Sequence, residues 1–143
     1  MESFYGAVGD PEDPPPLRRP PLISFIDDDT SFRLATDSLL RARGYCVCAF
    51  SSAADFLHSP QVDQTSCLIT DVQMSGINGL ELQSLLRKQG CTVPIIFVTA
   101  FPDESARARA LRDGAVCYLS KASDAAALIR CIEAALRFAG SAD

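Results

Sequence analysis

Acidic residues gather directly after one apolar segment of the chain, at Asp27, Asp28 and Asp29. A further carboxylate, Asp71, follows a second apolar segment, residues 67–70. Clustered carboxylates repel one another and need a counter-charge, and their hard oxygens suit Mg²⁺, which takes few carboxylates and keeps several waters. The acidic residues therefore predict a magnesium site, provided that the fold brings Asp71 to the acidic run.

Two other polar residues end apolar segments and complement these carboxylates. Thr99 can donate a hydrogen bond from its hydroxyl, and the Lys121 ammonium can pair with an anion. A metal ion, an ammonium and a hydroxyl around one carboxylate describe a site for phosphoryl transfer, where catalysis depends on positioning and charge neutralisation. A carboxylate can itself be the nucleophile and form an aspartyl phosphate. Asp29 also has a purely structural interpretation, as the N-cap of a helix.

Five short apolar segments alternate with helical patterns, and these elements must position the polar residues. The apolar segments are residues 22–26, 45–50, 67–70, 94–99 and 115–120. Four of them are nearly continuous in apolar residues, which is typical of parallel strands covered on both faces. Amphipathic helical patterns follow the strands, with stop signals at Gly44, Gly90 and Gly114.

This alternation predicts an α/β fold, a flavodoxin-like (βα)5 doubly wound parallel sheet with strand order 2-1-3-4-5. The first and third strands are neighbours in such a sheet, which would bring Asp71 to the acidic run. Ligands bind outside the carboxyl ends of the strands, near the point where the strand order reverses. We therefore expect the functional site at these strand ends.

The length of 143 residues is enough for one domain with a proper core, which we expect over residues 21–139. Residues 1–21 hold six of the nine prolines, so we expect a disordered tail over residues 1–20. Residues 140–143 are expected to form a short C-terminal tail.

The composition argues against several classes of protein. A formal net charge of −5 does not favour a nucleic-acid surface, which needs clustered Lys and Arg. No apolar run is long enough to span a membrane and no secretory signal is found, so the expected compartment is the cytoplasm. The six cysteines lack a paired CxxC spacing and lie mostly among apolar neighbours, so we expect reduced core thiols.

Taken together, these motifs resemble the receiver domains of bacterial two-component response regulators. The resemblance covers about residues 21–138 and rests on four sequence motifs, FIDDD, LITDVQMSGINGLEL, IIFVTA and CYLSK. The residues of the second motif are most similar to those of the subfamily fused to LuxR-type helix-turn-helix output domains.

The resemblance implies that Asp71 accepts a phosphoryl group from a sensor histidine kinase. It implies Mg²⁺ as the cofactor, with Asp28 as a direct ligand and Asp27 acting mainly through water. Asp71 itself and the backbone carbonyl of Gln73 would complete the protein ligands. The domain would be a signalling switch and no enzyme in the ordinary sense, although it would catalyse its own Mg²⁺-dependent phosphorylation and autodephosphorylation.

The resemblance also assigns the parts of the switch. Thr99 would turn its hydroxyl toward the phosphoryl group, Lys121 would pair with that group, and the Tyr118 ring would report the state. The fourth helix, fifth strand and fifth helix would form the output face and could support a homodimer. If the natural chain is longer, an output DNA-binding domain would follow, and the receiver itself would contact neither nucleic acid nor membrane.

Two residues depart from the family's usual pattern. Ser75 and Ala122 stand where the family commonly has proline, and the proline after the family's lysine forms a cis bond. A cis bond without proline is costly, so either the fold holds that strain or the bond is trans and Lys121 is aimed differently. These departures leave a second function open, a pseudo-receiver that binds a protein partner without phosphorylation.

A third reading of the acidic run is enzymatic. Three aspartates after a strand also fit the start of haloacid-dehalogenase-type phosphatases, in which Asp27 would be the nucleophile. The chain is short for that fold, and no acidic pair follows Lys121, so we do not favour this reading.

Overall fold

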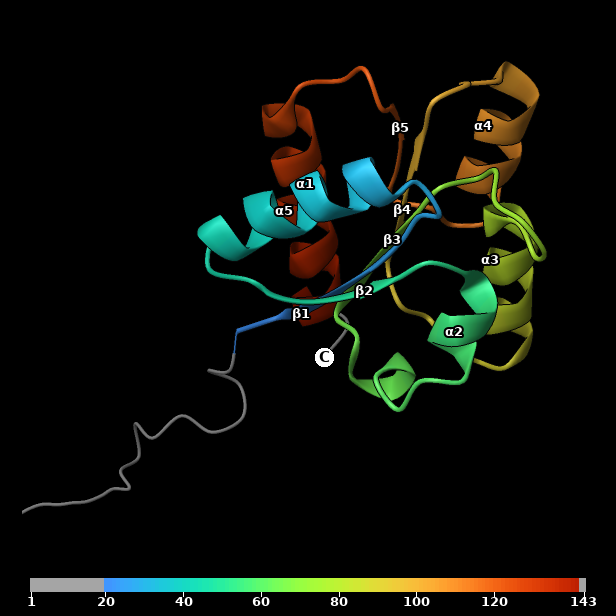
Figure 1. Ribbon diagram of the computed structural model, residues 1–143. Helices are drawn as coiled ribbons and strands as arrows, with labels where there is room; N and C mark the ends of the chain where they lie inside the picture. The colour runs from blue at the N-terminus through green and yellow to red at the C-terminus, as the bar shows by residue number, and fades with distance from the viewer. Residues whose placement is uncertain (1–19, 142–143) are drawn as a thin grey trace, which may run out of the picture.

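Five parallel strands form one sheet in the order β2-β1-β3-β4-β5, as the sequence predicts (Figure 1). The computed structural model describes residues 20–141, so the tail predicted over residues 1–20 lies almost wholly outside the described residues. The strands are β1 (Leu22–Ile26), β2 (Cys46–Phe50), β3 (Cys67–Thr70), β4 (Ile95–Thr99) and β5 (Cys117–Ser120).

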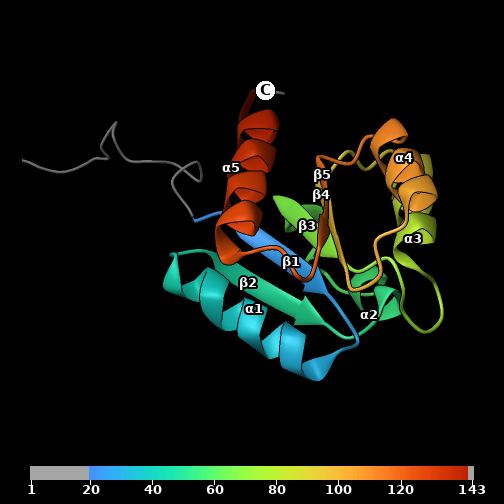
Figure 2. The same cartoon turned by 90° about the horizontal axis from the view of Figure 1, so that it is seen from above.

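Helices cover both faces of the sheet. They are α1 (Thr30–Ala42), α2 (Ala53–Leu57), α3 (Gly79–Lys88), α4 (Glu104–Arg112) and α5 (Ala125–Ser141), with a short 3-10 turn at Val62–Gln64. Helices α1 and α5 lie on one face, and α2, α3 and α4 lie on the other (Figures 1 and 2). Helix α5 extends two residues into the range 140–143 predicted as a tail. No helix among residues 20–141 is both long and apolar enough to cross a membrane.

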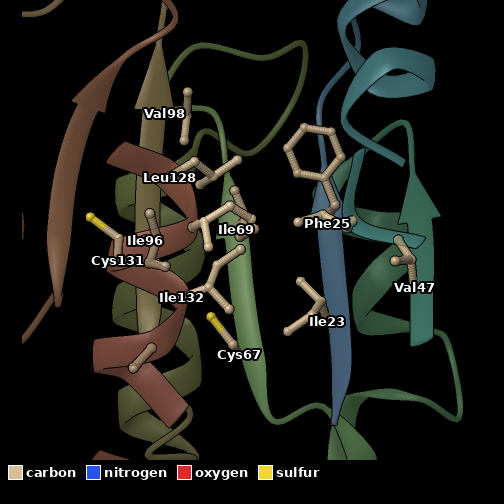
Figure 3. Close-up of a cluster of buried hydrophobic side chains, with 13 residues drawn as sticks. Ile23, Phe25, Val47, Cys67, Ile69, Ile96, Val98, Leu128, Cys131 and Ile132 are labelled. Carbon is tan, nitrogen blue, oxygen red and sulfur yellow. The ribbon is translucent and has the colours of Figure 1, made fainter. Parts of the chain in front are cut away.

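Two apolar clusters fill the space between the sheet and its helices. On the side of α1 and α5, Ile23, Phe25, Ile69 and Ile132 are almost fully buried (Figure 3). On the other side the core includes Phe56, Leu82 and Phe97, also fully buried. Because both faces of β1, β3 and β4 are covered, their side chains are apolar in both directions, which explains the continuous apolar runs in the sequence.

Polar caps fix where the helices begin near the strand ends. The Asp29 side chain accepts a hydrogen bond from the Phe32 N–H and caps α1, as the sequence predicts. Asn78 and Glu81 form a reciprocal capping box at the start of α3. Each helix therefore starts at a defined residue after its strand, which sets the length of the loops that carry the candidate site.

Helix α4 is attached to the rest of the domain mainly by polar contacts. Ala110 is its only buried residue. The buried Gln83 side chain of α3 donates hydrogen bonds from its amide to the carbonyls of Ala110 and Asp113, at 3.1 and 3.4 Å. The Ala110 carbonyl also accepts a hydrogen bond from the Ala115 N–H, so Gln83 adds a side-chain donor at the end of the helix. The carboxyl end of α4 is thus fixed to α3 through one amide.

The prediction that all cysteines are reduced is wrong for one pair. Cys117 of β5 and Cys131 of α5 form a disulfide, with their Cα atoms 6.2 Å apart. The two positions are 14 residues apart in the chain and lack any recognisable spacing, and only the packing of α5 against the sheet brings them together. Four cysteines are free, as predicted; among them Cys46 is exposed, and burial raises the pKa of the Cys67 thiol to about 12.

Candidate functional site

The centre of the candidate site is an ammonium held between two carboxylates. The Lys121 Nζ atom lies 2.8 Å from Asp27 Oδ2 and 3.2 Å from Asp71 Oδ2. Asp27 is fully buried, and Asp71 is 5 % exposed. The three residues follow β1, β3 and β5. The structure therefore brings together side chains that are far apart in the sequence, since Asp27 and Lys121 are separated by 94 positions. We therefore treat this ion-paired triad as the organising element of the site.

Backbone hydrogen bonds continue the sheet just past its strand ends and place these residues. The Asp71 N–H donates to the Ile26 carbonyl at 3.1 Å, and the Lys121 N–H donates to the Thr99 carbonyl at 2.8 Å. Strands β1 and β3 are paired in register, with Ile26 opposite Thr70. Asp27 and Asp71 are consequently adjacent positions on neighbouring strands, as the predicted topology requires.

The pKa shifts of Asp27 and Lys121 show how this ion pair is balanced. Burial raises the pKa of the Asp27 carboxyl, although the hydrogen bond and charge of Lys121 and the Asp29 N–H act in the opposite direction. Burial also opposes the charge on Lys121, but Asp27 and, to a smaller extent, Asp71 raise the pKa of its ammonium above the ordinary value. Lys121 is therefore a firmly protonated cation that two carboxylates share.

Asp28 points elsewhere. It is exposed, and its Oδ2 atom accepts a hydrogen bond from the Ser75 N–H at 3.3 Å. A proline at position 75 has no N–H and could not make this bond. The departure at Ser75 therefore changes the site directly, because it gives Asp28 a backbone donor in the loop after β3.

The loop after β3 also binds Asp71. The Gln73 N–H donates to Asp71 Oδ1 at 3.1 Å, so the two oxygens of this carboxylate have different partners, an N–H and the Lys121 ammonium. Gln73 was predicted to act through its carbonyl, and the structure shows a contact of its N–H only.

Thr99 and Tyr118 both contact the loop between β4 and α4. The buried Thr99 accepts a hydrogen bond at its hydroxyl oxygen from the Phe101 N–H at 3.3 Å. The Tyr118 hydroxyl accepts one from the Asp103 N–H, also at 3.3 Å, and its ring packs on Phe97 with centroids 6.3 Å apart. The two residues predicted as a switch thus bind the same loop, at the beginning of α4.

The departure at Ala122 leaves the lysine in place. No peptide bond among residues 20–141 is cis, so Lys121 is joined to Ala122 by a trans bond. Lys121 nevertheless reaches both carboxylates, and its Nζ atom lies 4.6 Å from the centre of the Phe32 ring. Neither of the two outcomes that the sequence left open is found in full, because the bond is trans and the lysine still points into the site.

Two residues of the site were missed in the sequence. Arg33 donates from Nη1 to the Asp27 carbonyl at 2.6 Å and so fixes the end of β1 to α1. Gly79 begins α3 against the Asp71 carbonyl, where a Cβ atom would collide with that oxygen. A signal existed for Arg33, because a basic residue in the first turn of a helix opposes the helix dipole and suggests another role.

The donor set suits a hard cation, although its ligands are not gathered around one point. Among residues 20–141, no group of three or more His, Cys, Asp or Glu residues is close enough to hold a metal ion. The cause is visible in the contacts, since Asp28 turns to Ser75 and Lys121 lies between the other two aspartates. Mg²⁺ takes only one or two carboxylates and keeps waters, so a three-carboxylate cage is not required.

Comparison with known proteins gives the family. The family model of the response regulator receiver domain matches residues 23–133. The chain belongs to this family. A receiver domain is a component of two-component signal transduction, and the resemblance seen in the sequence motifs is thereby confirmed at the level of the family.

Individual relatives agree with this assignment. Nodulation protein W of Bradyrhizobium diazoefficiens is 40% identical over 100 residues, which cover 70% of this chain and 44% of the relative. The transcriptional regulatory protein FixJ of Azorhizobium caulinodans is 36% identical over 114 residues, 80% of this chain and 54% of the relative. The solved response regulator StyR superposes with a TM-score of 0.80 at 35% identity, covering 86% of this chain and 62% of that one. This receiver domain thus spans about half the length of the curated relatives it matches.

Replacing Lys121 by Met should destabilise the receiver domain in a pH-dependent way. Without the ammonium, the buried Asp27 carboxylate loses its counter-charge, and its pKa in the folded state rises further above the unfolded value. The folded protein then holds this proton more tightly than the unfolded chain, so stability falls as the pH rises. We expect a deficit of about 3–5 kcal/mol at pH 7 to 8 that shrinks toward pH 4.5.

Urea unfolding in EDTA at several pH values measures this deficit. Lys88, the only other lysine, is exposed at the end of α3, so Lys88→Met is the matched control and should show little change. A deficit for Lys121→Met that stays constant over the whole pH range would contradict the role assigned to Asp27.

Proposed function

We propose that this receiver domain accepts a phosphoryl group on Asp71 from a sensor histidine kinase and acts as a signalling switch. The observation that supports this most directly is the Lys121 ammonium, which sits against Asp71 Oδ2 at the carboxyl ends of the strands. A cation at this distance can pair with a phosphoryl oxygen once the carboxylate is esterified. Membership of the receiver family supports this class of reaction.

The proposed step is a displacement at phosphorus. An oxygen of Asp71 attacks, the bond between phosphorus and the imidazole nitrogen of the donor breaks, and the electron pair of that bond stays on the imidazole. The donor ring carries a proton on its other nitrogen, so it leaves as neutral imidazole and an aspartyl phosphate results. Lys121 offsets the charge of the transferred group, while the Gln73 N–H holds the other carboxylate oxygen. Later attack by water returns the carboxylate and releases phosphate, so the protein acts on itself and has no other substrate.

Mg²⁺ is the proposed cofactor of this step. Asp28 and Asp71 would be its direct protein ligands, with the Gln73 carbonyl as a third and Asp27 acting through water. When bound, the ion would neutralise the charge of the carboxylates and of the incoming phosphoryl group. Asp28 is exposed and accepts a 3.3 Å hydrogen bond from the Ser75 N–H, which a bound ion would have to replace.

Thr99 and Tyr118 are the proposed switch. Thr99 would exchange its hydrogen bond with Phe101 for one that its hydroxyl donates to the phosphoryl group. This change alters the loop between β4 and α4, to which the Tyr118 hydroxyl is also bound through Asp103. The output face formed by α4, β5 and α5 would then differ between the two states.

The proposed output is transcription, through a LuxR-type helix-turn-helix domain in a longer natural chain. FixJ, one of the relatives, is a transcriptional regulatory protein, and the receiver spans about half of it. Helix α4 carries both signs of charge, including an ion pair of Glu104 and Arg107 at 3.6 Å, which suits reciprocal pairing across a two-fold axis in a homodimer. The proposed compartment is the cytoplasm, and the receiver itself would contact neither nucleic acid nor membrane.

Acetyl phosphate with Mg²⁺ should add one phosphoryl group to the wild-type domain, and Asp71→Asn should abolish the adduct. The amide of Asn is a poor nucleophile, whereas its size and shape preserve the surrounding contacts. Intact-protein mass spectrometry measures the adduct, and hydroxylamine should remove it because an acyl phosphate is labile to that reagent.

Asp37→Asn is the matched control, since Asp37 pairs with Arg41 on the surface of α1, away from the site, and should leave the adduct unchanged. An adduct that survives Asp71→Asn, or its absence from the wild type, would overturn the proposal. Phosphatase turnover that depends on Asp27 and not on Asp71 would favour the enzymatic reading instead.

Ser75→Pro should strengthen Mg²⁺ binding. The Ser75 N–H competes with the ion for the Asp28 carboxylate, and a proline removes this donor. An exposed hydrogen bond of this length contributes about 0.5–1 kcal/mol, so its removal should lower the dissociation constant for Mg²⁺ about two- to fivefold. Calorimetric titration with Mg²⁺ measures the change. Ser75→Ala keeps the N–H and should bind Mg²⁺ like the wild type, so equal affinity for all three proteins would refute the role of this N–H.

A further inference from the structure

The Cys117–Cys131 pair joins two elements of the proposed output face, β5 and α5. Their Cα atoms are 6.2 Å apart, inside the range of 4.4–6.8 Å in which a disulfide forms without backbone movement. Strand β5 is also held by its pairing with β4, and α5 by its packing on the sheet, so the fold can carry either two thiols or one disulfide at this place. We call the bonded pair the β5–α5 clasp.

The two cysteines differ in their access to solvent. Cys117 is half-buried on β5, which is an edge strand with all four residues half-buried. Cys131 is 9 % exposed, and its sulfur points from α5 toward the side of the cluster where β5 lies (Figure 3). Because Cys117 is the less buried residue of the two, we assign the first attack to Cys117 and the second to Cys131.

Cys117 is also next to the residue that contacts α4. Successive side chains of a strand point to opposite faces, so Cys117 packs with the cluster around α5, whereas Tyr118 packs with the cluster around α3 and α4. The Tyr118 hydroxyl holds the beginning of α4 through the Asp103 N–H. A covalent bond at Cys117 therefore fixes the backbone of β5 immediately beside the residue that links it to α4.

We infer that the β5–α5 clasp is a reversible redox site that restrains the output face when it is oxidised. The oxidant is a small-molecule disulfide of the glutathione class. The Cys117 thiolate attacks one of its sulfurs and releases one small thiol; the Cys131 thiolate then attacks the mixed disulfide and releases a second. Two electrons pass from the cysteine pair to the reagent, and the two cysteine protons end on the two released thiols.

The regulatory half of this inference rests on the proposed function, whereas the covalent half does not. Disulfides in a reducing compartment are usually transient and respond to oxidants, which fits a clasp that is open by default in the proposed cytoplasmic location. When closed, it holds β5 against α5, so the face changes less when Asp71 is phosphorylated. Oxidation would thus weaken the response to the kinase without touching the triad.

The test uses the chain with Cys46, Cys48 and Cys91 replaced by Ser, so that the pair and Cys67 remain. Cys67 is fully buried and serves as an internal marker that the protein stays folded, because it should resist alkylation before and after oxidation. The matched control carries Cys131→Ala in addition. Oxidised glutathione should remove the mass of two hydrogen atoms from the first protein, and peptide mapping should link positions 117 and 131.

Hydrogen exchange then measures the restraint, without any phosphoryl group. Amides of Cys117–Ser120 should exchange at least about tenfold more slowly in the oxidised form, and a reducing agent should restore the rate. The Cys131→Ala control should show neither change. A stable glutathione adduct in place of the 117–131 link, or a link that leaves exchange unchanged, would overturn the inference.

Beryllofluoride with Mg²⁺, a mimic of the phosphoryl group, tests the regulatory half. Tyrosine fluorescence should change more in the reduced than in the oxidised form, since the chain has no tryptophan and Tyr118 lies at the moving loop. Equal changes in both forms would overturn regulation. A clasp that forms and slows exchange, while neither form responds to the mimic, would overturn regulation together with the proposed function and leave the covalent site standing.

Discussion

The structure depends on one electrostatic constraint, the placement of two buried carboxylates at the carboxyl ends of neighbouring strands. Asp27 and Asp71 repel each other and are largely removed from water, so their proximity requires a cation. Lys121 supplies this cation from the end of β5, the edge strand of the sheet. Strand order, strand length and the loop after β5 all have to agree for that ammonium to arrive. The site and the fold therefore cannot vary independently.

Much of this was visible in the sequence. Short apolar runs identified all five strands, and the runs of β1, β3 and β4 are nearly continuous because both faces of these strands are buried. The predicted starts at Tyr45 and Ala115 were early for one reason: their N–H groups bond to the last carbonyls of the preceding helices, at Leu40 and Ala110. A helix end and a strand start compete for the same residue, and the sequence pattern does not show which one it joins.

Contacts that depend on backbone direction were not visible. The Ser75 N–H bonds to Asp28, and the Gly79 backbone packs on the Asp71 carbonyl, because a loop folds back on its own strand end. Side-chain types carry no signal for such contacts. The disulfide was missed for a related reason, since Cys117 and Cys131 meet only after α5 has packed on the sheet. What the sequence does encode well is which residues end the strands, and this was sufficient to assemble the triad.

The attachment of α4 has a mechanical consequence. Its carboxyl end is bound by the Gln83 amide, and Ala110 is its only buried residue. Its beginning is bound to β5 through the Tyr118 hydroxyl, which accepts a hydrogen bond from the Asp103 N–H. Such a helix can rotate about its carboxyl end, at the hydrogen bond from Gln83. Over nine residues the helix is about 13 Å long, so a rotation of about 10° at this end would move Asp103 by about 2 Å. The Gln83 amide would therefore set how far the loop at Asp103 moves when α4 rotates.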